Sequence, residues 1–163
     1  MSKSHRLEIQ IKQTKPFAST REEAVLTILY TADTLRRRYG EVMAPFGVTF
    51  PQYNVLRIVR GAGEAGIPSQ EICERMIERS PGMTRLLDRL EQKGLVTRTR
   101  SSKDRRIVFC SLTSQGSSLL TEMEPSVRDV EQQAMASLDE ARLHELTDLA
   151  TEVYSSLDRR GTP

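Results

Sequence analysis

The stretch that decides the fold covers residues 80–113 and reads SPGMTRLLDRLEQKGLVTRTRSSKDRRIVFCSLT. In its first part, apolar residues recur three and four positions apart, which is the spacing of one face of an α-helix. These residues are Met83, Leu86, Leu87 and Leu90. Ser80 is a good N-cap, Pro81 suits the first helical position, and Gly94 suits the position just after a helix. We therefore predict a helix over residues 81–93.

The second part of this stretch predicts a β-hairpin. Residues 95–99 and 107–112 are rich in β-branched and apolar side chains, which favour strands. The segment between them reads RSSKDRR, so the tip of the hairpin is polar and strongly charged.

Helical patterns precede the stretch. Residues 20–42 carry a long apolar stripe, with Thr20 as the predicted N-cap. Two shorter helices are predicted to begin after the caps Thr49 and Ser69. Residues 1–19 show no clean period, and we interpret them as an arm.

Helical patterns also follow the stretch. Thr113 is predicted to cap a long helix, in which Pro125 should produce a kink or a restart. A break is expected over residues 137–139, and a last apolar stripe covers residues 143–157.

Two short helices followed by a hairpin are the parts of a winged helix-turn-helix. The predicted fold is mainly α with a small β-hairpin wing, a winged helix-turn-helix domain plus terminal dimerisation helices. Residues 47–113 would be the DNA-binding region, 20–46 and 114–163 the dimerisation helices, and 1–19 an N-terminal arm, in one intertwined domain. The terminal apolar stripes exceed what the central region can cover, so we expect a homodimer that buries them.

Composition excludes several classes of protein. The chain has 163 residues, of which 28 % are charged and 37 % hydrophobic, as in an ordinary globular domain. No stretch reaches the ~20 apolar residues of a membrane span, and residues 1–15 do not resemble a signal peptide, so a cytoplasmic protein is expected. There are two histidines, and no metal-ligand spacing, phosphate loop or nucleophile–base pair, so we expect no enzyme, no metal and no cofactor.

The distribution of charge points to a polyanionic partner. Residues 80–113 carry 8 basic and 3 acidic side chains, whereas residues 114–163 carry 4 and 10. A basic centre beside an acidic end attracts nucleic acid to one region only.

Double-stranded DNA is the partner we predict. The polar side of helix 81–93 would enter the major groove, where Arg can bind guanine through two hydrogen bonds. The predicted major-groove residues are Ser80, Thr84, Arg85, Asp88, Arg89 and Gln92. Asp88 could instead orient Arg85 or Arg89, or accept a hydrogen bond from a cytosine amine.

The hairpin would contact the minor groove and the phosphates. The predicted wing residues are Arg98, Arg100, Lys103, Asp104, Arg105 and Arg106. Arg98 and Arg100 suit phosphate contact, and Asp104 could hold the Arg106 guanidinium through a bidentate bridge. Ser69 and Gln70 are further candidates for contact with the DNA backbone.

At these residues the chain resembles the MarR family of bacterial regulators. The motif TRLLDRLE at residues 84–91, followed by KGLV at 93–96, resembles the recognition helix of that family. Residues 104–113 match its wing signature D-x-R-x-x-x-x-x-L-T, and FPQY at 50–53 resembles its second helix. The resemblance covers about residues 20–157 and implies a homodimeric repressor of an inverted-repeat operator. It also implies that Arg106 enters the minor groove, that Asp104 braces it, and that a small ligand or oxidant changes the operator affinity.

A ligand pocket is expected between the dimerisation helices and the DNA-binding core, where the resemblance places it. The candidate lining residues are Tyr30, Arg37, Tyr39, Phe46, Phe50 and Tyr53. A small aromatic or acidic effector would suit them, although aromatic residues at helical spacing also form plain core.

Two alternatives stay open. A redox-responsive regulator would use Cys110, predicted on a wing strand, or Cys73, predicted on a short helix and buried; neither has an obvious activating cluster. A winged-helix protein-interaction module would keep the fold without specific DNA binding.

Overall fold

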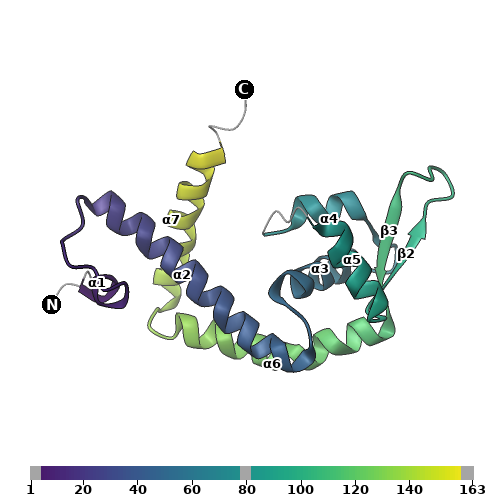
Figure 1. The fold of residues 1–163 in the computed structure, drawn as a ribbon, viewed down its shortest axis with the longest axis horizontal. Coiled ribbons are helices and arrows are strands. Elements are labelled where there is room, and N and C mark those ends of the chain that lie inside the picture. Colours follow the sequence, from purple (N-terminus) through teal and green to yellow (C-terminus); the bar gives the residue numbers. More distant parts are fainter. Residues whose placement is uncertain (1–4, 78–81, 159–163) are drawn as a thin grey trace. The chain divides into compact units, whose positions relative to one another are not determined.

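The computed structural model describes residues 5–77 and 82–158 of the chain (Figure 1). The elements in order are α1 (His5–Gln10), α2 (Thr20–Met43), the 3-10 helix η1 (Ala44–Phe46), α3 (Phe50–Gly61), β1 (Ile67–Pro68), α4 (Ser69–Arg75), α5 (Met83–Gln92), β2 (Val96–Arg100), β3 (Val108–Leu112), α6 (Ser114–Met135) and α7 (Glu140–Asp158). The mainly α fold with a small wing is confirmed. Among the described residues, no helix is long and apolar enough to cross a membrane.

The chain divides into two compact units, Met1–Thr121 and Glu122–Pro163. The core of the first unit forms around α3. Val55, Leu56 and Val59 on this helix are fully buried. The buried residues around them come from the neighbouring elements and include Ile67, Ile72, Leu87, Leu90, Val96 and Cys110.

Local rules account for the start of α3. Thr49 lies in an extended conformation and its hydroxyl accepts a hydrogen bond from the Gln52 amide at 3.5 Å. The Gln52 side chain in turn accepts from the Thr49 amide at 3.0 Å. This reciprocal capping box satisfies two amides that a helix start leaves unpaired, and it confirms the cap predicted at Thr49.

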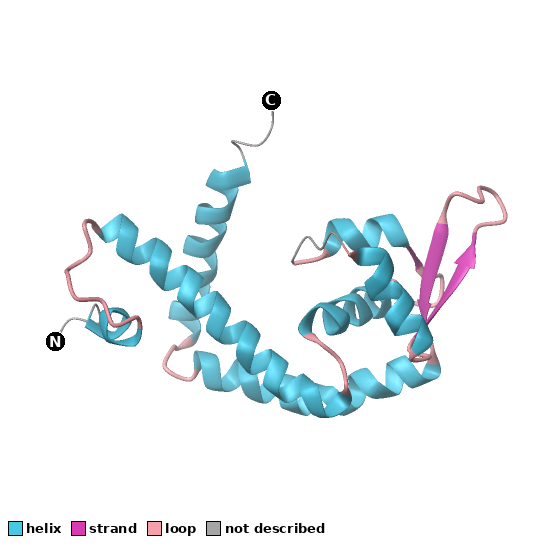
Figure 2. Cartoon of the chain, in the orientation of Figure 1, coloured by secondary structure: helices cyan, strands magenta, loops and turns pink. Residues whose placement is uncertain are grey.

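The hairpin of β2 and β3 extends away from the helices of the first unit (Figure 2). β3 lies in the middle of a three-stranded antiparallel sheet, with β2 on one side and the two-residue strand β1 on the other. β1 was not predicted, because two residues are too few for a periodic signal. In the β2–β3 register, Arg98 lies opposite Cys110.

Helix α5 has the predicted apolar side. Met83, Leu87 and Leu90 are buried and Leu86 is half-buried. The helix begins at Met83, two residues after the predicted start, and Gly94 follows it in the left-handed region, at φ 68°. The predicted caps at positions 80 and 81 lie outside the described residues.

Two of the predicted helix caps are corrected. The N-cap of α2 is Ser19, whose hydroxyl accepts from the Glu22 amide at 3.1 Å; Thr20 is the first helical residue. Ser69 is the first residue of α4, and no side chain caps that helix. α6 continues through Pro125, so of the predicted kink or restart the restart does not occur. The cap predicted at Thr113 is confirmed, since its hydroxyl accepts from the Gly116 amide at 3.0 Å.

The terminal helices leave apolar side chains uncovered in a single chain. In α7, Leu149 is 54 % exposed and Leu157 68 % exposed. In α2, Val25 is 55 % exposed and Leu29 60 % exposed. Such stripes are unfavourable in water and mark surfaces that contact another molecule.

Candidate nucleic-acid interface

The outward side of α5 is polar. Thr84, Arg85, Arg89 and Gln92 are all exposed, while the apolar residues of the same helix are buried or half-buried. Because the helical repeat separates the two sides, packing of the apolar side on the core leaves these four side chains free to meet a partner. Ser80 of the predicted set lies outside the described residues.

Asp88 belongs to a different cluster from the one predicted. Its Oδ1 accepts a hydrogen bond at 2.6 Å from Nη2 of Arg98 on β2, and not from Arg85 or Arg89. Glu91 accepts from the same guanidinium through Oε2, at 2.6 Å from Nη2 and 2.9 Å from Nε. Glu91 Oε1 also accepts from the Arg98 backbone amide at 3.2 Å.

This cluster argues against the prediction that Arg98 contacts phosphate. Its side chain is 23 % exposed and lies between two carboxylates. The hydrogen bond to Glu91, followed by that to Asp88, raises the pKa of Arg98 further above its ordinary value, against the opposing effect of burial. Arg98 therefore joins the helix to the wing. Sequence reasoning missed Glu91 altogether, because nothing in the spacing of residues 91 and 98 reveals that they meet.

The tip of the wing carries exposed cations. Arg100, Lys103, Arg105 and Arg106 are exposed. The tip is held by local hydrogen bonds: Ser101 Oγ accepts from the amides of Lys103 and Asp104, at 3.2 and 3.3 Å. Asp104 Oδ1 accepts from the Arg106 backbone amide at 2.9 Å. This contact forms an Asx turn, in place of the predicted bridge to the Arg106 guanidinium.

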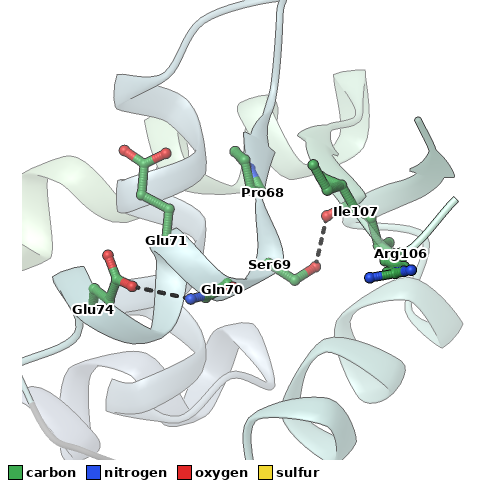
Figure 3. Close-up of a pocket in the computed structure, with 8 residues that line it drawn as sticks. Pro68, Ser69, Gln70, Glu71, Glu74, Arg106 and Ile107 are labelled. Atoms are coloured by element: carbon green, nitrogen blue, oxygen red, sulfur yellow. Dashed lines mark hydrogen bonds between the residues drawn. The ribbon is translucent and has the colours of Figure 1, made fainter. Parts of the chain in front are cut away.

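A cavity of about 440 Å³ lies between the start of α4 and the tip end of β3 (Figure 3). Its lining includes Gln70 and Glu74 on one side and Arg106 on the other. The Ser69 hydroxyl donates to the Val108 carbonyl oxygen at 3.1 Å, and Gln70 Nε2 donates to Glu74 at 3.5 Å. The Ser69 hydroxyl proton is therefore engaged inside the protein, which argues against the predicted donation from this hydroxyl to the DNA backbone.

The residues proposed for a ligand pocket lie in the first unit. All five aromatic residues, Tyr30, Tyr39, Phe46, Phe50 and Tyr53, are half-buried. The rings of Tyr39 and Phe50 pack with centroids 5.3 Å apart. Arg37 is exposed and bonded to Asp33 at 3.2 Å. None of these residues lines the cavity beside the wing.

The two cysteines differ in environment. Cys73 is exposed, so the prediction that it is buried is wrong. Cys110 is buried on β3, and desolvation raises the pKa of its thiol to about 11, although the charge of Arg98 opposes the shift. A protonated, buried thiol is a poor redox sensor, which argues against the use of Cys110. Over residues 5–77 and 82–158, no cluster of three metal-ligating side chains occurs.

Comparison with known proteins places this geometry in a family. The profile described as MarR family matches residues 46–107, which include α3, α4, α5 and the start of the wing. The repressor MdtR of Bacillus subtilis is 42 % identical over 76 residues, which are 47 % of this chain and 48 % of MdtR. The match to this curated relative thus spans about half of its length.

Solved structures match over more of the chain. A MarR transcription factor from Planctomyces limnophilus is 36 % identical with a TM-score of 0.65, over 83 % of this chain and 98 % of that one. A mutant MarR from Escherichia coli, solved in complex with operator DNA, is 28 % identical with a TM-score of 0.71, over 78 % and 90 %. Together with the outward polar side of α5 and the cationic wing, these matches show that the chain belongs to the MarR family.

Proposed function

We propose that this chain is a homodimeric transcription regulator that binds an inverted-repeat operator and represses it. The observation that carries the proposal is the exposed polar side of α5 next to an exposed cationic wing tip. Both lie in residues 80–113, which hold 8 basic and 3 acidic side chains. Membership of the MarR family, which includes a relative bound to operator DNA, supports the same function. Because the proposed target is DNA and the family is one of bacterial regulators, we place its action in the cytoplasm.

The side chains divide into two kinds of DNA contact. Arg85 and Arg89, with Thr84 and Gln92, would meet base edges in the major groove, because they project from the exposed side of α5. Arg106 would enter the minor groove, whose negative potential attracts Arg. Arg100, Lys103 and Arg105 would bind phosphates, which fix the register of the protein without reading sequence.

A dimer follows from the uncovered apolar stripes. Leu29 on α2 and Leu149 and Leu157 on α7 are each more than half exposed in one chain. We propose that residues 20–46 and 114–163 pair with those of a second copy, while residues 47–113 bind DNA. A two-fold dimer would present two α5 helices to half-sites about 10 bp apart.

We propose a small aromatic or acidic effector as the regulating ligand. The residues that support an aromatic ligand are the half-buried Tyr39 and Phe50, because aromatic side chains are the type that packs against aromatic ligands. A ligand that binds one form of the dimer better would shift its affinity for DNA.

The DNA-binding proposal is tested with a duplex that the wild-type protein selects from a random library. We expect a gel shift, and the logarithm of the association constant should fall linearly with the logarithm of the salt concentration. The selected sites should contain an inverted repeat. Arg106→Ala should weaken binding by about 1–3 kcal/mol. Arg128→Ala removes the same charge from an exposed position on α6 and should leave the affinity within about twofold.

Two outcomes would contradict the proposal. Equal affinity for the selected duplex and for unrelated duplexes at physiological salt would show that binding is not sequence-specific. No salt-dependent DNA binding, with a stable protein partner recovered instead, would favour a winged-helix interaction module.

A further inference from the structure

Arg98 differs from the neighbouring cation on its own strand. Arg100 lies two residues further along β2, and therefore on the same face of the sheet, but it is exposed. Arg98 is largely covered, and its guanidinium makes three hydrogen bonds of 2.6–2.9 Å to two carboxylates of α5. A planar guanidinium that donates several hydrogen bonds to carboxylates fixes the relative orientation of these groups and also pairs their charges.

The pairing of the two wing strands determines the direction of the Arg98 side chain. In the β2–β3 register Arg98 stands opposite Cys110, and cross-strand partners share one face of a sheet. Cys110 has no exposed surface. The stem of Arg98 therefore starts from the covered face of the sheet, and its charged end reaches α5.

We propose that Arg98 is a positioning residue for DNA binding: it locks the wing to α5 and neutralises Asp88 and Glu91. The inference rests on the proposed function and deepens it. Asp88 and Glu91 lie three residues apart, on one side of the helix that would enter the major groove. Unpaired, these carboxylates would repel phosphates, and Asp88 would compete with DNA for the base-reading arginines.

The lock also sets the spacing of the two contact surfaces. The polar side of α5 and the tip of the wing must meet adjacent grooves of the same duplex. Hydrogen bonds from one guanidinium to two carboxylates of α5 hold the strand that leads to the tip. Loss of this support should therefore weaken binding even when the two carboxylates are neutralised.

A positioning residue and a residue that binds phosphate directly respond differently to loss of the two carboxylates. A thermodynamic cycle therefore distinguishes these two roles for Arg98. Arg98→Met keeps the stem and removes the charge. It is combined with the pair Asp88→Asn and Glu91→Gln, which removes both carboxylate charges at nearly constant shape. Arg100→Met is the matched control on the same strand and face. Affinities are measured by fluorescence anisotropy on the duplex selected by the wild-type protein, at several salt concentrations.

We expect Arg98→Met to weaken binding about tenfold, with unfolding monitored separately by circular dichroism. Adding the carboxylate pair should restore most of that loss, because no unpaired carboxylates remain, and the remaining deficit of up to about threefold measures the lost connection between the wing and α5. In the Arg100→Met background, Asp88→Asn with Glu91→Gln should change the DNA affinity by the same factor as in the wild-type background. Arg100→Met itself should lower the salt slope by about 0.9 per protomer, as the loss of a phosphate contact does.

Three results would overturn the proposal. The first is wild-type affinity for Arg98→Met. The second is an equal gain from the carboxylate pair in both methionine backgrounds, which would reduce the effect to long-range repulsion. The third is no rescue together with a salt slope like that of Arg100→Met, which would make Arg98 a phosphate ligand. If Arg98→Met unfolds, the triple variant is still expected to fold, since it contains no uncompensated charge in this cluster. Its DNA affinity and salt slope then test the proposal. Failure of the wild-type protein to select any duplex would instead refute the proposed function.

Discussion

Gly116 allows a sharp test of how α6 meets the base of the wing. This buried glycine lies in the first turn of α6, and a Cβ atom added to it would lie 3.0 Å from the carbonyl carbon of Leu95 and closer still to the carbonyl oxygen. The Leu112 Cγ would be 3.2 Å away. The Leu95 carbonyl oxygen also accepts from the Thr113 amide at 3.1 Å. Alanine would therefore push α6 away from backbone atoms that cannot rotate aside.

The magnitude follows from two opposing effects. Gly→Ala inside a helix stabilises by about 0.5–1 kcal/mol, because the unfolded chain loses freedom. Overpacking costs about 1–3 kcal/mol. We expect Gly116→Ala to lower the free energy of unfolding by about 1–2 kcal/mol. Gly40→Ala, in α2, meets nothing within 4 Å, so it should raise the free energy of unfolding by about 0.5–1 kcal/mol.

Thermal unfolding followed by circular dichroism measures both variants. At this chain length, about 1 kcal/mol shifts Tm by roughly 2–4 °C, so the two variants should move in opposite directions from wild type. All samples are compared at one protomer concentration, because dimerisation makes Tm depend on concentration. A Gly116→Ala protein as stable as the Gly40→Ala protein would refute the close approach of α6 to residue 95.

Three further predictions concern the thiols and the apolar stripe. A maleimide at pH 7 should label Cys73 and leave Cys110 unlabelled in the native protein, with both labelled in denaturant; labelling of Cys110 under native conditions would contradict its burial. The folded-state pKa of Cys110 is raised to about 11 from 9.0, so its contribution to stability is complete below pH 9 and is lost as the pH rises from about 9 to about 11, and urea unfolding should show that loss. Leu149→Glu should weaken dimerisation at least about 100-fold in sedimentation equilibrium, since each protomer loses roughly 1.5 kcal/mol or more of apolar burial. Thr151→Glu, an exposed position on another side of α7, should leave the dimer intact, and an unchanged Leu149→Glu dimer would place the interface elsewhere.

Much of the fold could be predicted from the sequence because its signals are local. The apolar spacing at Leu87 and Leu90 defines the buried side of α5, and the left-handed glycine at position 94 follows the helix. Thr49 and Thr113 cap their helices through hydroxyls that reach three residues ahead. Such patterns act within one or two turns, so tertiary context did not override them. The DNA contacts assigned to these elements stay predictions.

The remaining features depend on residues distant in sequence. The Ser69 hydroxyl bonds to the carbonyl of Val108, 39 positions away, and so does not cap α4 as local propensity suggested. Burial separates Cys110 from Cys73, although sequence alone placed both on regular elements.

The same holds for the cluster that joins the helix to the wing. By itself, the sequence determined that a helix with one polar side is followed by a cationic hairpin. Only the tertiary structure decided that Arg98 turns inward to Asp88 and Glu91 rather than outward to phosphate. The physical reason is the β2–β3 register, which sets Arg98 opposite buried Cys110 and so directs its charge to the nearest carboxylates.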